Sequence, residues 1–209
     1  MPEQGPVLAF DTSAAHCAAA LVQGDRVLAH RHEEMALGQA ERLLPLLAEL
    51  LDEAGLDWSD LALITTGVGP GNFTGIRISV ATARGLALGL GIRSVGVSTL
   101  DALREGHEAT VLPSIDARGG KLYLGLPSGP ELCALDALPD LPWEALCIGH
   151  EAERLAELCG GTVAEPALPL AVAIAQIARD GRGEAVSRPR PLYIRAPDAA
   201  PAKPAPPVA

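Results

Sequence analysis

Residues 61–80 read LALITTGVGPGNFTGIRISV, a stretch with the three parts of a strand–turn–helix unit. Residues 61–66 form an apolar, β-branched run that is typical of a buried strand. A glycine-rich turn follows at positions 67–71. The periodic residues 75–90 predict a helix, and Thr74 is placed to cap it. Such a unit directs the positive end of a helix dipole, and the first helical N–H groups, out of the turn. The turn is therefore a candidate anion site.

The glycine spacing matches neither standard phosphate motif. A P-loop requires lysine after its last glycine, where this chain has Ile76. A Rossmann fingerprint requires a glycine at its sixth position, and Asn72 and Thr74 occupy the two places where that glycine would stand. A tight turn that binds nothing and a phosphate-binding turn are both compatible with the spacing.

Length and charge limit the kinds of function to consider. The 209 residues are enough for one large or two small domains. The net charge is −10, from 16 basic and 26 acidic residues, whereas a protein that grips nucleic acid by itself usually has a basic face. Lysine and arginine cluster only in residues 182–195. If the protein acts on nucleic acid, we expect a partner protein to make most of the contact.

Hydropathy and cysteine content favour a cytoplasmic protein with no membrane partner. Mean hydropathy is +0.23, but no apolar run approaches the roughly 20 residues of a membrane span. The N-terminus lacks the basic region and apolar core of a secretory signal. The four cysteines are widely spaced, which predicts neither a disulfide framework nor a zinc site.

The first third of the chain predicts strands and an amphipathic helix. Residues 7–10 form an apolar strand that ends in the turn residues Asp11, Thr12 and Ser13. Residues 17–22 and 26–31 are expected to pair as a hairpin. Residues 34–55 carry a broad leucine face, interrupted by Pro45. That face fits either the protein core or a partner helix.

The helix expected at residues 75–90 carries small residues at four-residue steps: Gly75, Ser79, Ala83 and Ala87. Such a ridge is smooth enough for another helix to approach closely. Glycine inside a helix costs up to about 1 kcal/mol relative to alanine. Gly85 and Gly89 are therefore expected to have a packing reason.

The order of elements predicts an α/β fold. A strand at residues 94–97 and a helix at 98–105 complete a unit that resembles the ribonuclease H-like unit of actin-like ATPases, a mixed sheet flanked by helices. We expect an N-terminal subdomain at residues 1–107, a smaller C-terminal subdomain at 108–195, and a disordered Pro/Ala-rich tail at 196–209. The second subdomain should contain strands near residues 110–116, 121–126 and 144–149, with helices at 151–159 and 168–179.

Several segments resemble one family in the same order along the chain. GPGNFTGIRI at residues 69–78 is similar to the signature of the bacterial TsaB (YeaZ) family. LAFDTS at 8–13, ERLLP at 41–45, IDARGGKLY at 115–123 and RPLYIR at 190–195 also resemble the family. The resemblance covers nearly all of residues 7–195 and is thin between 127 and 184.

The resemblance implies a non-catalytic scaffold. TsaB is the partner of TsaD, the enzyme that transfers threonylcarbamoyl to the adenosine beside the tRNA anticodon. The resemblance implies that this chain forms a heterodimer with a TsaD-like subunit, that a TsaE-like ATPase docks on the complex, and that the chain forms a homodimer when alone. It also implies that tRNA is contacted only through the complex and that the chain requires no cofactor. The predicted partner interface comprises Leu43, Leu44, Leu47, Leu50, Leu51, Ile76, Ser79, Val80, Ala83 and Ala87.

The resemblance also implies that a catalytic metal site is missing. The two metal-binding histidines of TsaD correspond to Thr99 and Leu103 here, and neither side chain replaces imidazole. His30 and His32 share one face of a strand, but no third ligand is in view. We therefore predict no metal site and no catalytic residues.

Other readings stay open. The chain could be an independent actin-like ATPase or small-molecule kinase, or a nucleotide-binding module with weak affinity for ATP or ADP. A metallopeptidase is a further alternative, against which the missing ligands argue. The residues that would form a nucleotide or phosphate turn are Asp11, Thr12, Ser13, Gly69, Gly71, Asn72 and Thr74.

Overall fold

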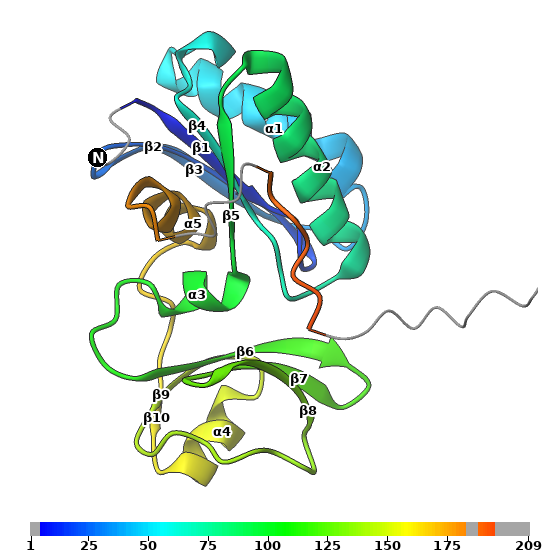
Figure 1. Cartoon of the computed structure of the whole chain (residues 1–209), viewed down its shortest axis with the longest axis vertical. Coiled ribbons are helices and arrows are strands. Elements are labelled where there is room, and N and C mark those ends of the chain that lie inside the picture. Colours follow the sequence, from blue (N-terminus) through cyan, green and yellow to red (C-terminus); the bar gives the residue numbers. More distant parts are fainter. Residues whose placement is uncertain (1–4, 183–187, 195–209) are drawn as a thin grey trace, which may run out of the picture.

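The computed structural model describes residues 5–182 and 188–194, which contain two five-stranded mixed sheets (Figure 1). The first sheet has the order β3-β2-β1-β4-β5, formed by β1 Val7–Asp11, β2 His16–Gln23, β3 Arg26–Glu34, β4 Leu63–Gly67 and β5 Arg93–Val97. The second has the order β10-β9-β6-β7-β8, formed by β6 Val111–Arg118, β7 Lys121–Leu126, β8 Gly129–Ala134, β9 Leu146–Gly149 and β10 Thr162–Val163. The predicted α/β fold is confirmed.

Helices cover both sheets. They are α1 Gln39–Ala54, the short 3₁₀ turn η1 Trp58–Asp60, α2 Phe73–Leu90, α3 Thr99–Arg104, α4 Ala152–Cys159 and α5 Leu170–Arg179. In Figure 1, α1 and α2 lie on one face of the first sheet and α5 lies on the other. Helix α3 lies between the two sheets, and α4 packs on the far face of the second sheet. No helix among the described residues is both long and apolar enough to cross a bilayer.

The central strand β1 is buried because both faces of its sheet are covered. Val7 and Ala9 belong to the apolar cluster that contains α5, whereas Leu8 and Phe10 belong to the cluster that contains the leucines of α1. Successive side chains of a strand point to opposite faces, so one short apolar run serves two cores. Strand β1 pairs antiparallel with β2 and parallel with β4. Because β1 and β4 run in the same direction, the turns that follow them lie at the same end of the sheet.

The assignment of the last part of residues 108–195 to the second subdomain is wrong. Helix α5 packs on the first sheet, although residues 108–195 were expected to form the second subdomain. Residues 188–194, here called the strap, also return to the first sheet, where the Leu192 N–H donates to the Val68 carbonyl at 2.8 Å. The apolar positions of α5 complete the core on the face of the sheet that α1 and α2 leave open. The predicted tail at 196–209 lies outside the described residues.

One helix boundary and two strands differ from the expectations. Helix α1 begins at Gln39, not near residue 34, because β3 continues to Glu34. Pro45 is accommodated inside the helix. Strands β8 and β10 were not predicted; both are edge strands, and β8 contains Pro130, which suits an edge position because proline has no N–H to donate.

A charged cluster fixes α1 to β3. Arg42 donates two hydrogen bonds of 2.7 Å to Glu33 on β3. It also donates to the carboxylate of Glu49, about two turns further along α1. This contact turns the Arg42 flank of α1 toward β3. The opposite flank, which carries Leu44 and Ala48, therefore points away from β3.

The Arg42 contact predicts a pH-dependent stability difference for Glu33→Gln. The hydrogen bonds from Arg42 lower the pKa of Glu33 below its ordinary value. The stabilisation is therefore complete above the unfolded pKa of about 4.3 and is lost as pH falls through the lower folded pKa. Because the pair is partly exposed, we expect a loss below about 1 kcal/mol at neutral pH.

Urea unfolding of Glu33→Gln and the unsubstituted protein, at neutral and acidic pH, measures this difference. The gap between the two proteins should shrink in acid. Glu131→Gln, which removes an exposed carboxylate from the edge strand β8 with no ion pair among the described residues, is the control and should show no such gap. A gap that widens in acid would contradict the assignment.

Candidate functional site

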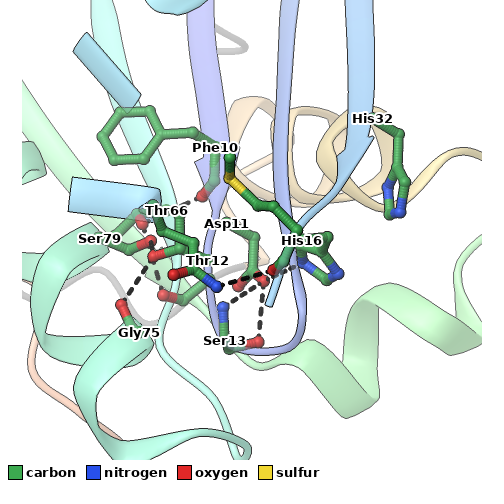
Figure 2. Close-up of polar contacts among 12 residues, drawn as sticks. Phe10, Asp11, Thr12, Ser13, His16, His32, Thr66, Gly75 and Ser79 are labelled. Atoms are coloured by element: carbon green, nitrogen blue, oxygen red, sulfur yellow. Dashed lines mark hydrogen bonds and ion pairs between the residues drawn. The ribbon is translucent and has the colours of Figure 1, made fainter. Parts of the chain in front are cut away.

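The glycine turn before α2 packs directly against the turn after β1 (Figure 2). Helix α2 begins at Phe73, and the Asn72 side chain caps it by accepting a hydrogen bond from the Gly75 N–H at 3.0 Å. The prediction that Thr74 caps the helix is wrong. Asn72 stands one residue before the helix in an extended conformation, which is the geometry of an N-cap, whereas Thr74 is already inside the first turn.

Glycines allow the two turns to touch. A Cβ at Gly75 would lie 1.7 Å from the Thr12 carbonyl oxygen, and a Cβ at Gly71 would lie 2.4 Å from the Ser13 carbonyl oxygen. The Asn72 N–H donates to that same Ser13 carbonyl at 2.6 Å. The backbone of Thr12 and Ser13 therefore packs against the glycine-rich turn. The Ser13 carbonyl oxygen accepts the N–H of Asn72 that an anion would otherwise bind.

Thr12 fastens the first turn to the helix. Its hydroxyl donates to the Gly75 carbonyl at 2.7 Å and lies 2.8 Å from the Ser79 hydroxyl (Figure 2). All of these groups are buried. The small residues at positions 75 and 79 are thus explained by a contact within the chain.

Asp11 is fully buried beside this contact. Its Oδ1 accepts hydrogen bonds from the N–H and the hydroxyl of Ser13, both at 2.8 Å, and lies 2.8 Å from Nε2 of His16. Its Oδ2 has no hydrogen-bond partner among the described residues and faces Gly67, where a Cβ would lie 1.8 Å away. Figure 2 shows His16 pointing at this carboxylate. Asp11 therefore orders the turn, and sequence reasoning missed its partner because His16 stands in no motif.

The structure brings most of the predicted phosphate-turn residues together but uses them internally. Asp11, Thr12, Ser13 and Asn72 are engaged in the hydrogen bonds given above. A Cβ at Gly69 would meet the Ile76 side chain at 2.5 Å, so this glycine also serves a contact within the turn. A phosphate would have to displace the β1–β2 turn from α2. The geometry therefore favours the reading of a tight turn over that of a phosphate site.

Thr99 and Leu103 line a cavity of about 540 Å³ between the subdomains. His16 and His32 line it too, with ring centroids 4.8 Å apart, and most of the remaining wall is apolar. His32 also lies 2.9 Å from a Glu34 carboxylate oxygen. Within residues 5–182 and 188–194, no three His, Cys, Asp or Glu side chains gather closely enough to hold a metal ion.

The cysteines are poor candidates for nucleophiles. All four are buried. Burial, reinforced by the charge of Glu33, raises the pKa of the Cys17 thiol to about 11. Burial and a sulfur contact with Cys159 raise the pKa of Cys147 to about 12. Reactive cysteines need the opposite environment, one that stabilises the thiolate.

The residues named as the partner interface are wrong, because all but one are buried in the protein's own core. The leucine face of α1 packs on the first sheet, and the ridge of small residues on α2 faces inward. Leu44, with 48% of its surface exposed, is the exception. The buried members are Leu43, Leu47, Leu50, Leu51, Ile76, Ser79, Val80, Ala83 and Ala87.

Leu44 and Ala48 on α1, with Ala81 and Gly85 on α2, are apolar or small, and they define what we call the α1–α2 face. All four are exposed. A Cβ at Gly85 or at Gly89 would have no neighbour within 4 Å, so the expected packing reason does not lie inside the described chain. Small side chains on an exposed helix surface suit close approach by another helix.

The strap adds an aromatic contact that sequence patterns did not indicate. The Arg77 guanidinium lies 3.8 Å from the centre of the Phe73 ring, and its Nε donates to the Tyr193 hydroxyl at 3.2 Å. Leu192 packs against the cluster formed by Val68, Ile76 and Val80. Only the three-dimensional return of the strap joins these distant segments.

Comparisons with known proteins match this fold. The model of the TsaD family, tRNA N6-adenosine threonylcarbamoyltransferase, matches residues 32–132. YeaZ from Pseudomonas aeruginosa is 29% identical with a TM-score of 0.70, and the match covers 90% of this chain and 99% of that one. The activator of 2-hydroxyisocaproyl-CoA dehydratase from Clostridium difficile, 9% identical with a TM-score of 0.54 over 85% of this chain and 95% of that one, shares the fold alone.

A curated relative identifies the family. The tRNA threonylcarbamoyladenosine biosynthesis protein TsaB of Escherichia coli is 31% identical over 226 aligned positions, which cover 90% of this chain and 94% of that protein. TsaB of Bacillus subtilis is 34% identical over 57% of this chain and 54% of its own length. Similarity over nearly the full length of both chains, together with the YeaZ fold, means that this chain belongs to the TsaB (YeaZ) family.

Proposed function

We propose that the chain is a non-catalytic subunit in tRNA threonylcarbamoyladenosine biosynthesis and that it binds a TsaD-like catalytic subunit through the α1–α2 face. Family membership supports the pathway. The observation that carries the binding surface is the exposed strip of Ala81 and Gly85 on α2, which no element of the described chain covers. The buried, hydrogen-bonded state of Asp11 and Thr12 supports a role without phosphate chemistry at that turn.

The helix-propensity penalty of Gly85 favours a role for the exposed Ala81 and Gly85 in binding a partner. Glycine in a helix interior is less favourable than alanine by up to about 1 kcal/mol. Gly85 carries that penalty in open space, with no contact in the described chain that requires it. A helix that packs across Ala81 and Gly85 would approach the α2 backbone closely, and Leu44 would add apolar area at the rim.

The remaining parts of the proposal follow from the same role. A TsaE-like ATPase docks on the complex, tRNA is contacted only through the complex, and the chain itself needs no cofactor. Without its partner, the exposed α1–α2 face pairs with a second copy, because the same apolar strip suits a self-complementary contact. The complex works in the cytoplasm, where tRNA is modified.

Reconstitution of tRNA modification tests the proposal. Purified TsaD-like and TsaE-like subunits, tRNA, ATP and a threonylcarbamoyl donor should form modified tRNA only when this chain is added, and this chain alone should form none. Mass spectrometry of the digested tRNA measures the product. Full activity without this chain, or turnover by this chain alone, would overturn the proposal.

A further inference from the structure

The cavity of about 540 Å³ that Thr99 and Leu103 line has no role in the proposed function. We call it the interdomain cavity, and its wall comes from the turn after β1, from β2, β3, α3 and β6, and from residues 166–170, which lead into α5. Among the described residues that form this wall, none belongs to α1 or α2, so a partner on the α1–α2 face would not cover it. Its volume lies within the range of roughly 300 to 1,000 Å³ that is usual for ligand pockets.

Most of the wall is apolar. Leu103 of α3, Ile115 of β6 and Leu168 contribute branched aliphatic side chains, and none of the described residues in the wall is lysine or arginine. The buried carboxylate of Asp11 stands behind the wall, where it holds two of the residues that line the cavity. An anion would therefore lose its hydration here without meeting a lysine or arginine side chain.

Four polar side chains line the cavity, and three of them are engaged within the chain. The Ser13 hydroxyl donates to Oδ1 of Asp11, and Nε2 of His16 lies 2.8 Å from the same oxygen (Figure 2). Nε2 of His32 pairs with a carboxylate oxygen on its own strand. Thr99 differs, because it is only 6% exposed and its Oγ1 has no hydrogen-bond partner among the described residues. A buried hydroxyl of this kind gains free energy when a ligand supplies the missing partner.

The start of α5 adds a weak positive field. Leu170 is the first residue of this helix and lines the cavity, and the first N–H groups of a helix have no partner inside it. That helix end carries about half a positive charge. The carboxylate of Asp11 and the loss of hydration both oppose an anion, and half a charge does not outweigh them. An uncharged carbonyl oxygen can accept from such donors without that cost.

We propose that the interdomain cavity binds a small uncharged molecule with an apolar body and an amide or carbonyl group, which accepts a hydrogen bond from the Thr99 hydroxyl. The apolar body packs on Leu103, Ile115 and Leu168. A nucleotide is not the expected ligand, because its phosphates are charged. The inference goes beyond the proposed function and does not depend on it, because the wall and the α1–α2 face share no residue.

Benzamide, benzoate and benzylammonium have nearly the same shape and differ in charge, so they test the class of ligand. Titration of the full, nitrogen-labelled chain, followed by two-dimensional NMR, measures affinity and shows which backbone amides respond. Benzamide should shift the amides of Thr99, Leu103 and Leu168, and it should bind more than about tenfold more tightly than either ion. The absence of benzamide binding would overturn the inference. An ion that binds within about tenfold of benzamide would overturn the uncharged class.

Thr99→Val removes the hydroxyl and keeps the shape of the side chain. It should weaken benzamide binding by about fivefold, the loss expected for one neutral hydrogen bond. The midpoint of urea unfolding should stay the same or rise, because the lost hydroxyl has no partner among the described residues. Thr65→Val is the matched control, since Oγ1 of Thr65 is buried in the same unpartnered state and Thr65 is not part of the wall. Equal losses of affinity in both variants, or none in Thr99→Val, would overturn the role of Thr99.

Leu103→Trp tests the location of the site independently of the hydroxyl. The indole ring would fill the cavity and should abolish benzamide binding, whereas Leu158→Trp, at an exposed position on α4, should leave it unchanged. Urea unfolding checks that both variants fold. Retained binding in a folded Leu103→Trp would overturn the cavity as the site. If that variant does not fold, the amide shifts of the unsubstituted chain decide, and shifts confined to residues outside the wall would overturn the inference.

Discussion

Gly85→Arg is expected to abolish binding to the TsaD-like subunit while leaving the fold intact. The position lies on the outer face of α2, and a Cβ there meets nothing within 4 Å. In the free protein, arginine at this helix position should raise stability by up to about 1 kcal/mol, because arginine is the better helix former. In the complex, the new side chain would bury an unpaired charge at a cost of about 3 to 5 kcal/mol.

That cost corresponds to a loss of affinity of more than about a hundredfold. A pull-down and a titration with the purified partner measure binding, and urea unfolding measures stability. The two readouts should move in opposite directions, which no destabilised variant can imitate. In gel filtration, the same variant should also shift the free chain from dimer to monomer.

Leu158→Arg is the matched control for the loss of binding. It introduces the same charge on an exposed helix position, 56% exposed, but on α4 of the second subdomain. Its partner affinity should match that of the unsubstituted chain. If Gly85→Arg binds as well as this control, the α1–α2 face is not the interface.

The sequence alone could not distinguish a helix face buried in the core from a face that binds a partner. A wide leucine face on α1 fits both a core and a partner, because periodicity defines a face without saying what covers it. The structure covers Leu43, Leu47 and Leu50 with the first sheet. On α2, Ala83 is buried in that same cluster, and Val80 is buried in the cluster with Val68 and Ile76. An arginine at either position would therefore test folding and not binding.

Local patterns were sufficient for most elements and insufficient for their assembly. Alternation and turn residues predicted β1 to β5, and periodicity predicted α1 and α2. The return of α5 to the first sheet was missed because its apolar pattern fits either core.

Gly75→Ala is expected to destabilise the protein by about 3 kcal/mol or more, the upper range for overpacking. The added Cβ would lie 1.7 Å from the carbonyl oxygen and 2.8 Å from the carbonyl carbon of Thr12. Both are backbone atoms, so no side-chain rotation relieves the contact. The shift would also disturb the hydrogen bonds of the Thr12 hydroxyl to the Gly75 carbonyl and to Ser79.

Gly85→Ala, in the same helix, is the matched control, and it should stabilise the protein by up to about 1 kcal/mol. Urea unfolding measures the free energy of unfolding of both variants, which the same added methyl group should lower at position 75 and raise at position 85. Gly75 has no positive φ, so backbone strain does not contribute to its loss. A glycine turn kept open for a ligand would accept the extra methyl group at position 75 with little loss of stability. A change within about 1 kcal/mol for Gly75→Ala would therefore contradict the tight-turn reading and restore the phosphate hypothesis.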